Sequence, residues 1–208
     1  MSKAIILSNG PSIMDLTDEQ ITKLCFGQTV FANKQALLRW PTAQYHCINN
    51  CHLQDYDYVT NVEVHAESRP QNKKVFKGEF IHYNVFGHHE DAVLITQKWD
   101  SLLLSNNKGT LPWCPGIMQE LTIPLAIDKG FTELIIVGWD MGLGYEHGVP
   151  CPHEPKYTIV EWEHNAMVNS SESYYNWLLK NGIQIKLLST QSSLSDAIPR
   201  VTLEEAVA

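Results

Sequence analysis

The 208-residue sequence has no hydrophobic run near the roughly 18 apolar residues that indicate a membrane-spanning helix. Its opening residues, MSKAIILSNGPS, contain one lysine and an apolar stretch too short for the core of a secretion signal. The 5 cysteines are an odd number without the spacing of a disulfide framework, so free thiols are expected. These absences predict a cytoplasmic protein without a transmembrane segment.

Basic residues are also scarce. Lys and Arg number 15 against 23 Asp and Glu, which gives a net charge of −8. A nucleic-acid partner is therefore not expected, because binding along a phosphate backbone relies on many Lys and Arg contacts. A small anionic ligand is compatible with this charge, since backbone N–H groups and a few cations suffice to hold one phosphate.

The chain also lacks internal repeats and low-complexity tracts, and its apolar content of 44% is typical of globular proteins. One domain over residues 1–208 is expected. Apolar runs alternate with helical patterns, which predicts a Rossmann-like α/β domain with a largely parallel sheet and helices on both faces. The expected strands are Ala4–Ser8, Thr29–Ala32, Tyr45–Ile48, Glu79–Val85, Glu133–Val137 and Ile183–Leu187.

Helix signals fall between these strands. Thr17 stands three residues before Gln20, as in a capping box, and Thr202 begins a short terminal helix. Pro124 should kink the helix that contains it, because it removes a backbone hydrogen bond. The other helices are expected over 92–104, over 117–129 with Gly130 as its stop, and from about Asn169 to Gly182.

A long loop is expected before the last large helix. Three glycines and three prolines between Gly142 and Pro155 oppose a packed element there. The segment 142–165, with its histidine-bearing end, is long enough to close over a ligand. We therefore expect a lid.

Polar residues follow the ends of several expected strands. They are Asn9-Gly10-Pro11-Ser12, Asn33, Asn49 with Asn50, and Asp140. Because ligands of open parallel sheets bind beyond the carboxyl ends of the strands, these residues predict one site. Gly10 would let the backbone approach a phosphate, Ser12 would offer a hydroxyl, and the asparagines would bond to a base, ribose or sugar. Taken alone, the turn at Gly10 is more typical of an ordinary strand-to-helix connection.

Six segments in a fixed order carry a resemblance to a known family: KAIILSNGPSI, VFANKQALL, YHCINN, CPGIMQELTIPLAIDKGFTELIIVGWDM, the loop ending WEHN, and YYNWLLKNGIQIKLLSTQSSL. Together they resemble the single-domain bacterial sialyltransferases that use CMP-sialic acid. They are also similar to a broader group that includes archaeal hydroxymethylpterin pyrophosphokinases and accessory glycosyltransferases of flagellin. The segment from Cys51 to Leu111 matches poorly.

The resemblance implies a site for the nucleotide or donor sugar made of Asn9, Gly10, Ser12, Asn33, Asn49 or Asn50, Gly116 and Tyr145. Gly116 matches the glycine of a serine-glycine pair, with Pro115 in place of the serine. Tyr145 matches one of two tyrosines that steady the leaving phosphate, and Gly142 stands where the other is expected. His164 corresponds to the catalytic base, and an imidazole is suited to take a proton from a hydroxyl at neutral pH.

The sequence therefore predicts a metal-independent glycosyltransferase without a cofactor, which uses a nucleotide sugar, CMP-linked if the resemblance holds, and a glycan or other hydroxyl acceptor. Two alternatives stay open. A pyrophosphokinase-like enzyme would use ATP and Mg²⁺, with Asp140 as a metal ligand instead of a structural or sugar-facing group. A binding module would hold a nucleotide without catalysis. A structural zinc site would use the Cys and His side chains of the segments 46–52 and 151–153, but beyond the spacing of Cys47 and Cys51 it lacks a clean second ligand pair. A homo-oligomer is compatible with the sequence.

Overall fold

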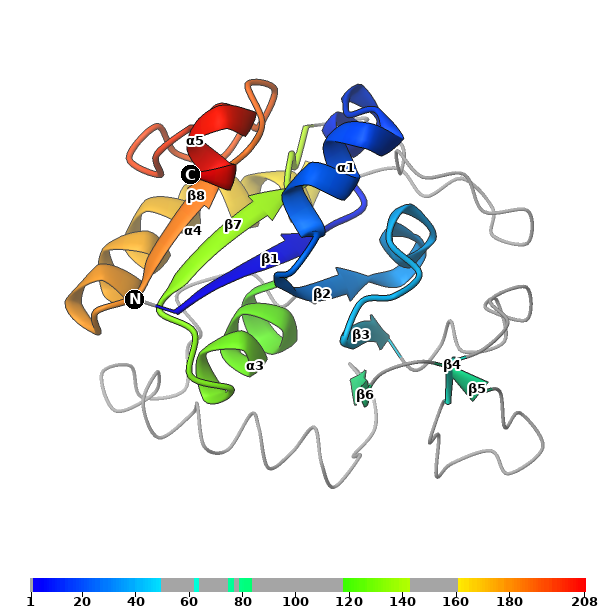
Figure 1. Cartoon of the computed structure of the whole chain (residues 1–208). Helices are drawn as coiled ribbons and strands as arrows, with labels where there is room; N and C mark the ends of the chain where they lie inside the picture. Colours follow the sequence, from blue (N-terminus) through cyan, green and yellow to red (C-terminus); the bar gives the residue numbers. More distant parts are fainter. Residues whose placement is uncertain (1, 50–61, 64–74, 77–78, 84–117, 143–160) are drawn as a thin grey trace.

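The computed structural model describes residues 2–49, 62–63, 75–76, 79–83, 118–142 and 161–208 (Figure 1). Six strands form one sheet in the order β6-β3-β2-β1-β7-β8, and each neighbouring pair is parallel. The strands are β1 Lys3–Leu7, β2 Thr29–Asn33, β3 Tyr45–Asn49, β6 Glu79–Tyr83, β7 Glu133–Val137 and β8 Gln184–Leu187. A separate antiparallel pair joins β4 Val62–Glu63 to β5 Val75–Phe76. The predicted Rossmann-like α/β class is confirmed.

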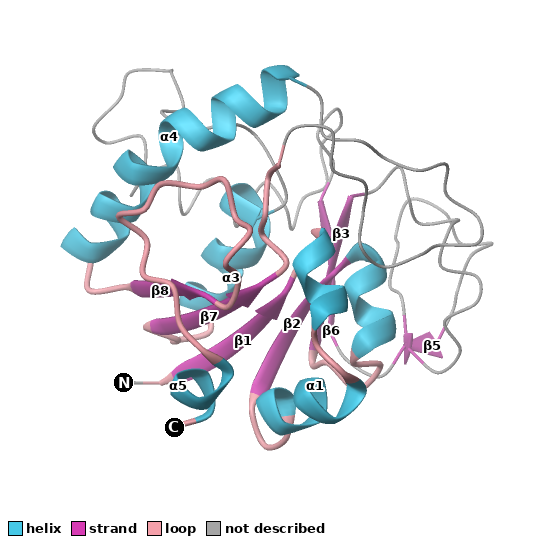
Figure 2. Cartoon of the chain, turned by 90° about the horizontal axis from the view of Figure 1, so that it is seen from above, coloured by secondary structure: helices cyan, strands magenta, loops and turns pink. Residues whose placement is uncertain are grey.

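Helices cover both faces of the sheet (Figure 2). One face carries α3 Ile123–Asp128 and α4 Glu161–Lys180, and the other carries α1 Asp18–Cys25, the 3₁₀ helix η2 Lys34–Arg39 and α5 Leu203–Val207. Alternate residues of β1 serve the two faces, because successive side chains of a strand point to opposite sides. Ala4 and Ile6 join the core under α3 and α4, whereas Ile5 and Leu7 join the core under α1 and η2.

The strand order defines a reversal point between β1 and β7. From β1 the chain adds β2, β3 and β6 successively on one side, and β7 and β8 then lie on the other side. In open α/β sheets, ligands bind in the crevice outside the carboxyl ends of the strands at such a reversal. The topology therefore predicts a ligand site beyond the carboxyl ends of β1 and β7.

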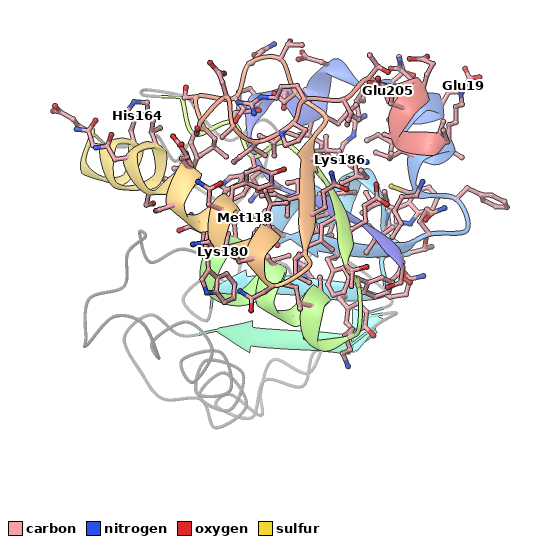
Figure 3. The ribbon with its side chains drawn as sticks, turned by 90° about the vertical axis from the view of Figure 1, so that its left-hand side faces the viewer. Glu19, Met118, His164, Lys180, Lys186 and Glu205 are labelled. Atoms are coloured by element: carbon pink, nitrogen blue, oxygen red, sulfur yellow. The ribbon has the colours of Figure 1, made fainter. Side chains whose placement is uncertain are left out.

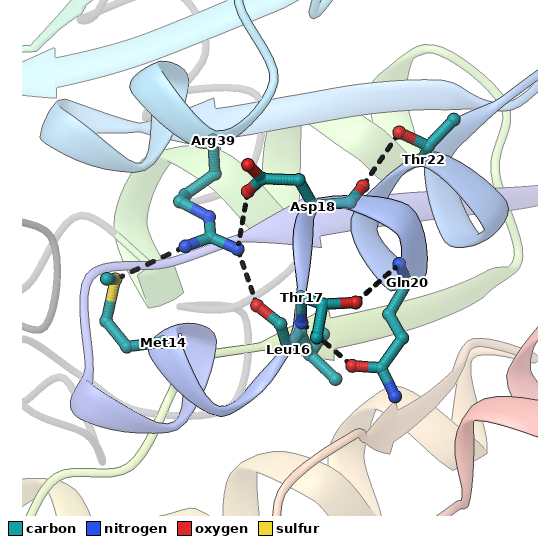
Figure 4. Close-up of polar contacts among 7 residues, drawn as sticks. All are labelled: Met14, Leu16, Thr17, Asp18, Gln20, Thr22 and Arg39. Atoms are coloured by element: carbon teal, nitrogen blue, oxygen red, sulfur yellow. Dashed lines mark hydrogen bonds and ion pairs between the residues drawn. The ribbon is translucent and has the colours of Figure 1, made fainter.

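The capping signals read from the sequence are confirmed. The Thr17 hydroxyl accepts a hydrogen bond from the Gln20 N–H at 3.2 Å, while the Gln20 side chain accepts from the Thr17 N–H at 2.8 Å (Figure 4). Thr202 and Glu205 make the same reciprocal pair at α5. Beside α1, the Arg39 guanidinium donates to the Leu16 carbonyl at 2.6 Å, which ties η2 to the segment that leads into α1.

Two helices differ from the expected boundaries. The α4 helix begins at Glu161 and not near Asn169, because buried Met167 and the following turns form one continuous face against the sheet. The expected helix 117–129 is a π-helical turn, η6 Met118–Thr122, followed by α3. Pro124 lies in the first turn of α3, directly after the wide turn, where its missing N–H removes one bond of the helical ladder.

No helix within the described ranges combines the length and apolar content needed to cross a membrane.

Two cysteines of the described segments, Cys25 and Cys47, are free thiols buried in the two cores. Burial raises the pKa of each thiol from 9.0 to about 12, because an apolar surrounding disfavours the thiolate.

We expect native protein at pH 8 to resist alkylation by iodoacetamide at both positions, measured by peptide mass spectrometry. Comparable labelling of native and guanidine-unfolded protein would contradict this.

The same shift has a consequence for stability. Because the pKa of each thiol is higher in the folded chain, the unfolded chain ionises first as the pH rises. The contribution to the free energy of unfolding is therefore complete below pH 9 and is lost progressively toward pH 12.

Candidate functional site

The turn after β1 closes directly onto the end of β7. The Ser8 N–H donates to the Val137 carbonyl at 2.8 Å, and the Gly10 N–H donates to the Gly138 carbonyl at 2.6 Å. A Cβ atom on Gly10 would lie 2.4 Å from the Gly138 oxygen and 2.5 Å from Asp140 Oδ2. The glycine is therefore required by the close approach of the two strand ends, a role that the expectation of a phosphate contact did not include.

Asp140 joins the ends of three strands through its carboxylate. Its Oδ2 accepts from the Ser12 N–H at 2.7 Å, and its Oδ1 accepts from the Ser12 hydroxyl at 2.7 Å and the Ser189 hydroxyl at 2.8 Å. The residue is 1% exposed. Three donors compensate the burial of this charge, since hydrogen bonds to an ionised group contribute about 1.5–3 kcal/mol each. The buried Asp140 carboxylate thus holds the segments that follow β1, β7 and β8 together at the reversal point.

Three N–H groups of the turn after β1, those of Gly10, Ser12 and Ile13, are engaged within the protein. Those of Gly10 and Ser12 bind Gly138 and Asp140, that of Ile13 binds the Gly10 carbonyl at 3.2 Å, and Pro11 has none. A phosphate would take these N–H groups only by displacing protein acceptors. The turn therefore does not present the row of ready donors that the sequence suggested.

A serine-rich segment after β8 also contacts the residues that follow β7. The sequence alone predicted no role for this segment. Besides Ser189, the Ser193 N–H donates to the Asp140 carbonyl at 2.7 Å, and the Ser192 hydroxyl donates to the Trp139 carbonyl at 2.8 Å. The Arg200 guanidinium holds the far side of the segment, with a bond of 2.8 Å to the Leu194 carbonyl.

Burial lowers the pKa of Arg200, and the nearby Asp196 carboxylate partly offsets this. The available sequence signal for the segment was its run of hydroxyl side chains, STQSSLS, directly after a strand.

The two asparagines at the ends of β1 and β2 serve opposite faces of the sheet. Asn9 Oδ1 accepts from the Ala36 N–H at 2.8 Å and so caps η2 from the neighbouring strand. Asn33 Oδ1 accepts from the Thr122 hydroxyl at 2.6 Å, and Asn33 Nδ2 lies 2.8 Å from Met118 Sδ. Both side chains are buried. The predicted ligand contact of Asn33 would require these bonds to be exchanged.

The shared sheet edge is confirmed. Leu7 pairs with Ala32 and with Val137, so β1, β2 and β7 end level with one another, and β3 ends at Asn49 on the same edge. Asn50, Gly116 and Tyr145 lie outside the described residues, as do residues 143–160 of the expected lid.

His164 lies in the first turns of α4, at the end of the helix opposite Lys180 (Figure 3). The end of the expected loop 142–165 is thus helical from Glu161. His164 Nδ1 lies 2.7 Å from the carbonyl oxygen of Met141, the residue after Asp140. Because a carbonyl only accepts, Nδ1 donates in this contact, and the tautomer whose single N–H is on Nδ1 has Nε2 as its acceptor.

Met141 has a φ of 52°, a left-handed conformation that is uncommon for a side chain of this size. Such a backbone costs on the order of 1–3 kcal/mol and persists where the surrounding contacts impose it. Here the contacts of Asp140 on one side and of His164 on the other hold the carbonyl in place. The His164 imidazole is therefore hydrogen-bonded to the residue that directly follows Asp140, whose carboxylate holds the reversal point.

Comparisons with protein-family models, with curated proteins and with solved structures found no match for this chain.

Proposed function

We propose that this protein is a metal-independent glycosyltransferase that transfers a sugar from a nucleotide to an acceptor hydroxyl in the cytoplasm. The observation that carries the proposal is the hydrogen bond of His164 Nδ1 to the Met141 carbonyl beside the β1–β7 reversal. It fixes the tautomer in which Nε2 accepts a proton, as a general base must. The resemblance to sialyltransferases supports the same residue and favours a CMP-linked donor.

In the proposed reaction, His164 Nε2 takes the proton of the acceptor hydroxyl as that oxygen forms a bond to the anomeric carbon. The bond between the anomeric carbon and the phosphate oxygen breaks, and the nucleotide leaves with the bonding electrons. A base positioned within hydrogen-bond reach of the acceptor contributes typically 10²–10⁴ in rate. The strained Met141 carbonyl supplies the second contact that such a base needs to keep its orientation.

The Mg²⁺-dependent phosphate-transfer alternative is less well supported by Asp140. A magnesium ligand must present its carboxylate oxygens to the ion or to the water around it. Both oxygens of Asp140 accept hydrogen bonds from Ser12 or Ser189, and the side chain is 1% exposed. A metal would have to replace three bonds that hold the strand ends together.

A thermal-shift series tests the proposal directly. The ligands are CMP, UDP, GDP and ADP with their sugar conjugates, each with and without Mg²⁺. We expect the cognate nucleotide sugar at 100 times its dissociation constant to add about 2.7 kcal/mol, which raises Tm by roughly 5 to 10 °C independently of Mg²⁺. Transfer is then measured with the stabilising donor and a panel of hydroxyl acceptors.

Three results would change the assignment. A shift that requires Mg²⁺ and ATP would favour phosphate transfer. A nucleotide-dependent shift with no transfer to any acceptor would favour a binding module, which uses the same strand ends and asks nothing of His164. If no nucleotide changes Tm, the proposed function is wrong.

A further inference from the structure

The side chain of Gln119 is fully buried, and neither its Nε2 nor its Oε1 has a hydrogen-bond partner in the structure as described. A buried amide without partners destabilises the folded chain relative to one that is hydrogen-bonded. Most buried polar side-chain atoms have a partner, so each exception calls for an explanation. A ligand group that completes the pairing is one such explanation.

Gln119 stands at the same sheet edge as the reversal point. It is the second residue of the π-helical turn η6, and its neighbours Met118 and Thr122 both contact Asn33, the last residue of β2. Pro124 accounts for the wide turn, because it lacks the N–H that an α-helix would use there. Single π-helical turns occur frequently at functional sites, where they redirect side chains.

A second unpartnered group lies on the same side of the sheet. The Trp139 indole Nε1–H has no partner in the described part of the chain, and the residue is 3% exposed. Trp139 is the second residue after β7 and shares the core under α3 and α4 with Met118. The elements that bound the reversal point on this face therefore carry two N–H donor groups and one acceptor in need of partners.

Their chemistry indicates what they would bind. A carboxamide presents a donor and an acceptor side by side, and its complement is a group with an acceptor beside a donor. A nucleobase edge has this pattern, whereas the acylamino group of a sugar is a trans amide whose N–H and C=O point in opposite directions. A phosphate does not have the pattern either, because it only accepts and would leave Oε1 unpaired.

We infer that Gln119 is a specificity-determining contact for a ligand edge that carries a donor beside an acceptor, namely the edge of a nucleobase. The inference rests on the proposed function, since it assigns Gln119 to the donor substrate of that site. It differs from the contacts that the resemblance implies, none of which involves this residue.

The test substitutes Gln119→Met, which keeps a similar volume and removes the amide. Without ligand we expect Tm to rise by at least about 2 °C, because an unpaired buried amide is lost. Affinity, measured by calorimetric titration, should fall at least about tenfold for at least one of the nucleotides CMP, UMP, AMP and GMP. Free N-acetylglucosamine and N-acetylneuraminic acid are the comparison probes, and their affinity should not change. A loss of affinity confined to these sugars would overturn the inference.

Gln44→Met is the comparison for an amide that is hydrogen-bonded and lies at the surface. Gln44 Oε1 accepts from the Val30 N–H at 2.8 Å, so the same substitution there removes a made bond and should lower Tm without changing affinity. If Gln119→Met lowers Tm as Gln44→Met does, or binds every probe as tightly as wild type, the inference is wrong while the proposed function stands. If the wild type binds no probe of either group, both fail.

Discussion

Replacing His164 with alanine is expected to reduce glycosyl transfer by roughly 10²–10⁴ while nucleotide affinity changes by no more than a few fold. The imidazole would act on the proton of the acceptor hydroxyl and would not touch the nucleotide. Its hydrogen bond to the Met141 carbonyl orients the ring but belongs to the protein. Initial rates at saturating donor, with donor affinity measured separately by titration, check both parts of the expectation.

Asn165→Ala is the matched control for this experiment. Asn165 is exposed on the same turn of α4, so its substitution should leave both rate and affinity near wild type. Ser12→Ala should behave in a third way. It removes a hydroxyl that donates to Asp140, so donor affinity and rate should fall together. Full activity in the His164 variant would show that this histidine is not the base.

Replacing Gly10 with alanine is expected to lower the free energy of unfolding by about 3 kcal/mol or more, and Tm by roughly 6 to 12 °C. The new methyl group would lie 2.4 Å from the Gly138 carbonyl oxygen and 2.5 Å from an Asp140 oxygen. Neither atom can withdraw cheaply, because one is backbone and the other holds Ser12 at 2.7 Å. Thermal and urea unfolding followed by circular dichroism measure the change.

Gly27→Ala separates this steric cost from the conformational cost of losing a glycine. Gly27 has a φ of 74° and no atom within 4 Å of the place that a Cβ would occupy. Its substitution should cost only the left-handed strain, about 1–2 kcal/mol. Gly10 has an ordinary backbone, with φ −64° and ψ 159°, so its penalty is one of contact alone. Equal losses in the two variants would contradict the close approach described here.

Much of the fold could be predicted because local signals and burial agree. The run ELIIV of β7 is buried on both faces, as expected of a central parallel strand. The capping box at Thr17 needs only two side chains three residues apart, so spacing alone revealed it. The sheet edge followed from the same logic, because parallel strands of similar length end together.

What the sequence did not reveal depends on contacts between distant segments. No residue near Asn9 in the sequence shows that its side chain caps η2, the helix that follows the next strand. The engagement of the turn at Ser12 by Asp140 was equally invisible, because a serine after a strand is compatible with a phosphate contact and with a protein contact. The start of α4 was placed late, since Asn169 and Glu172 have the spacing of a cap yet lie inside a helix that packing extends to Glu161.

The Asp140 carboxylate binds two serines that are synthesised long before and well after it. Its two serine partners stand 128 residues before it and 49 residues after it along the chain. Such pairings form late, because each closes a long loop and has no local nucleus. A nascent chain that has not yet reached Ser189 therefore lacks one of the three strand ends that the carboxylate joins. The hydrogen bonds of Asp140 to both serines can therefore form only after the chain has been synthesised as far as Ser189.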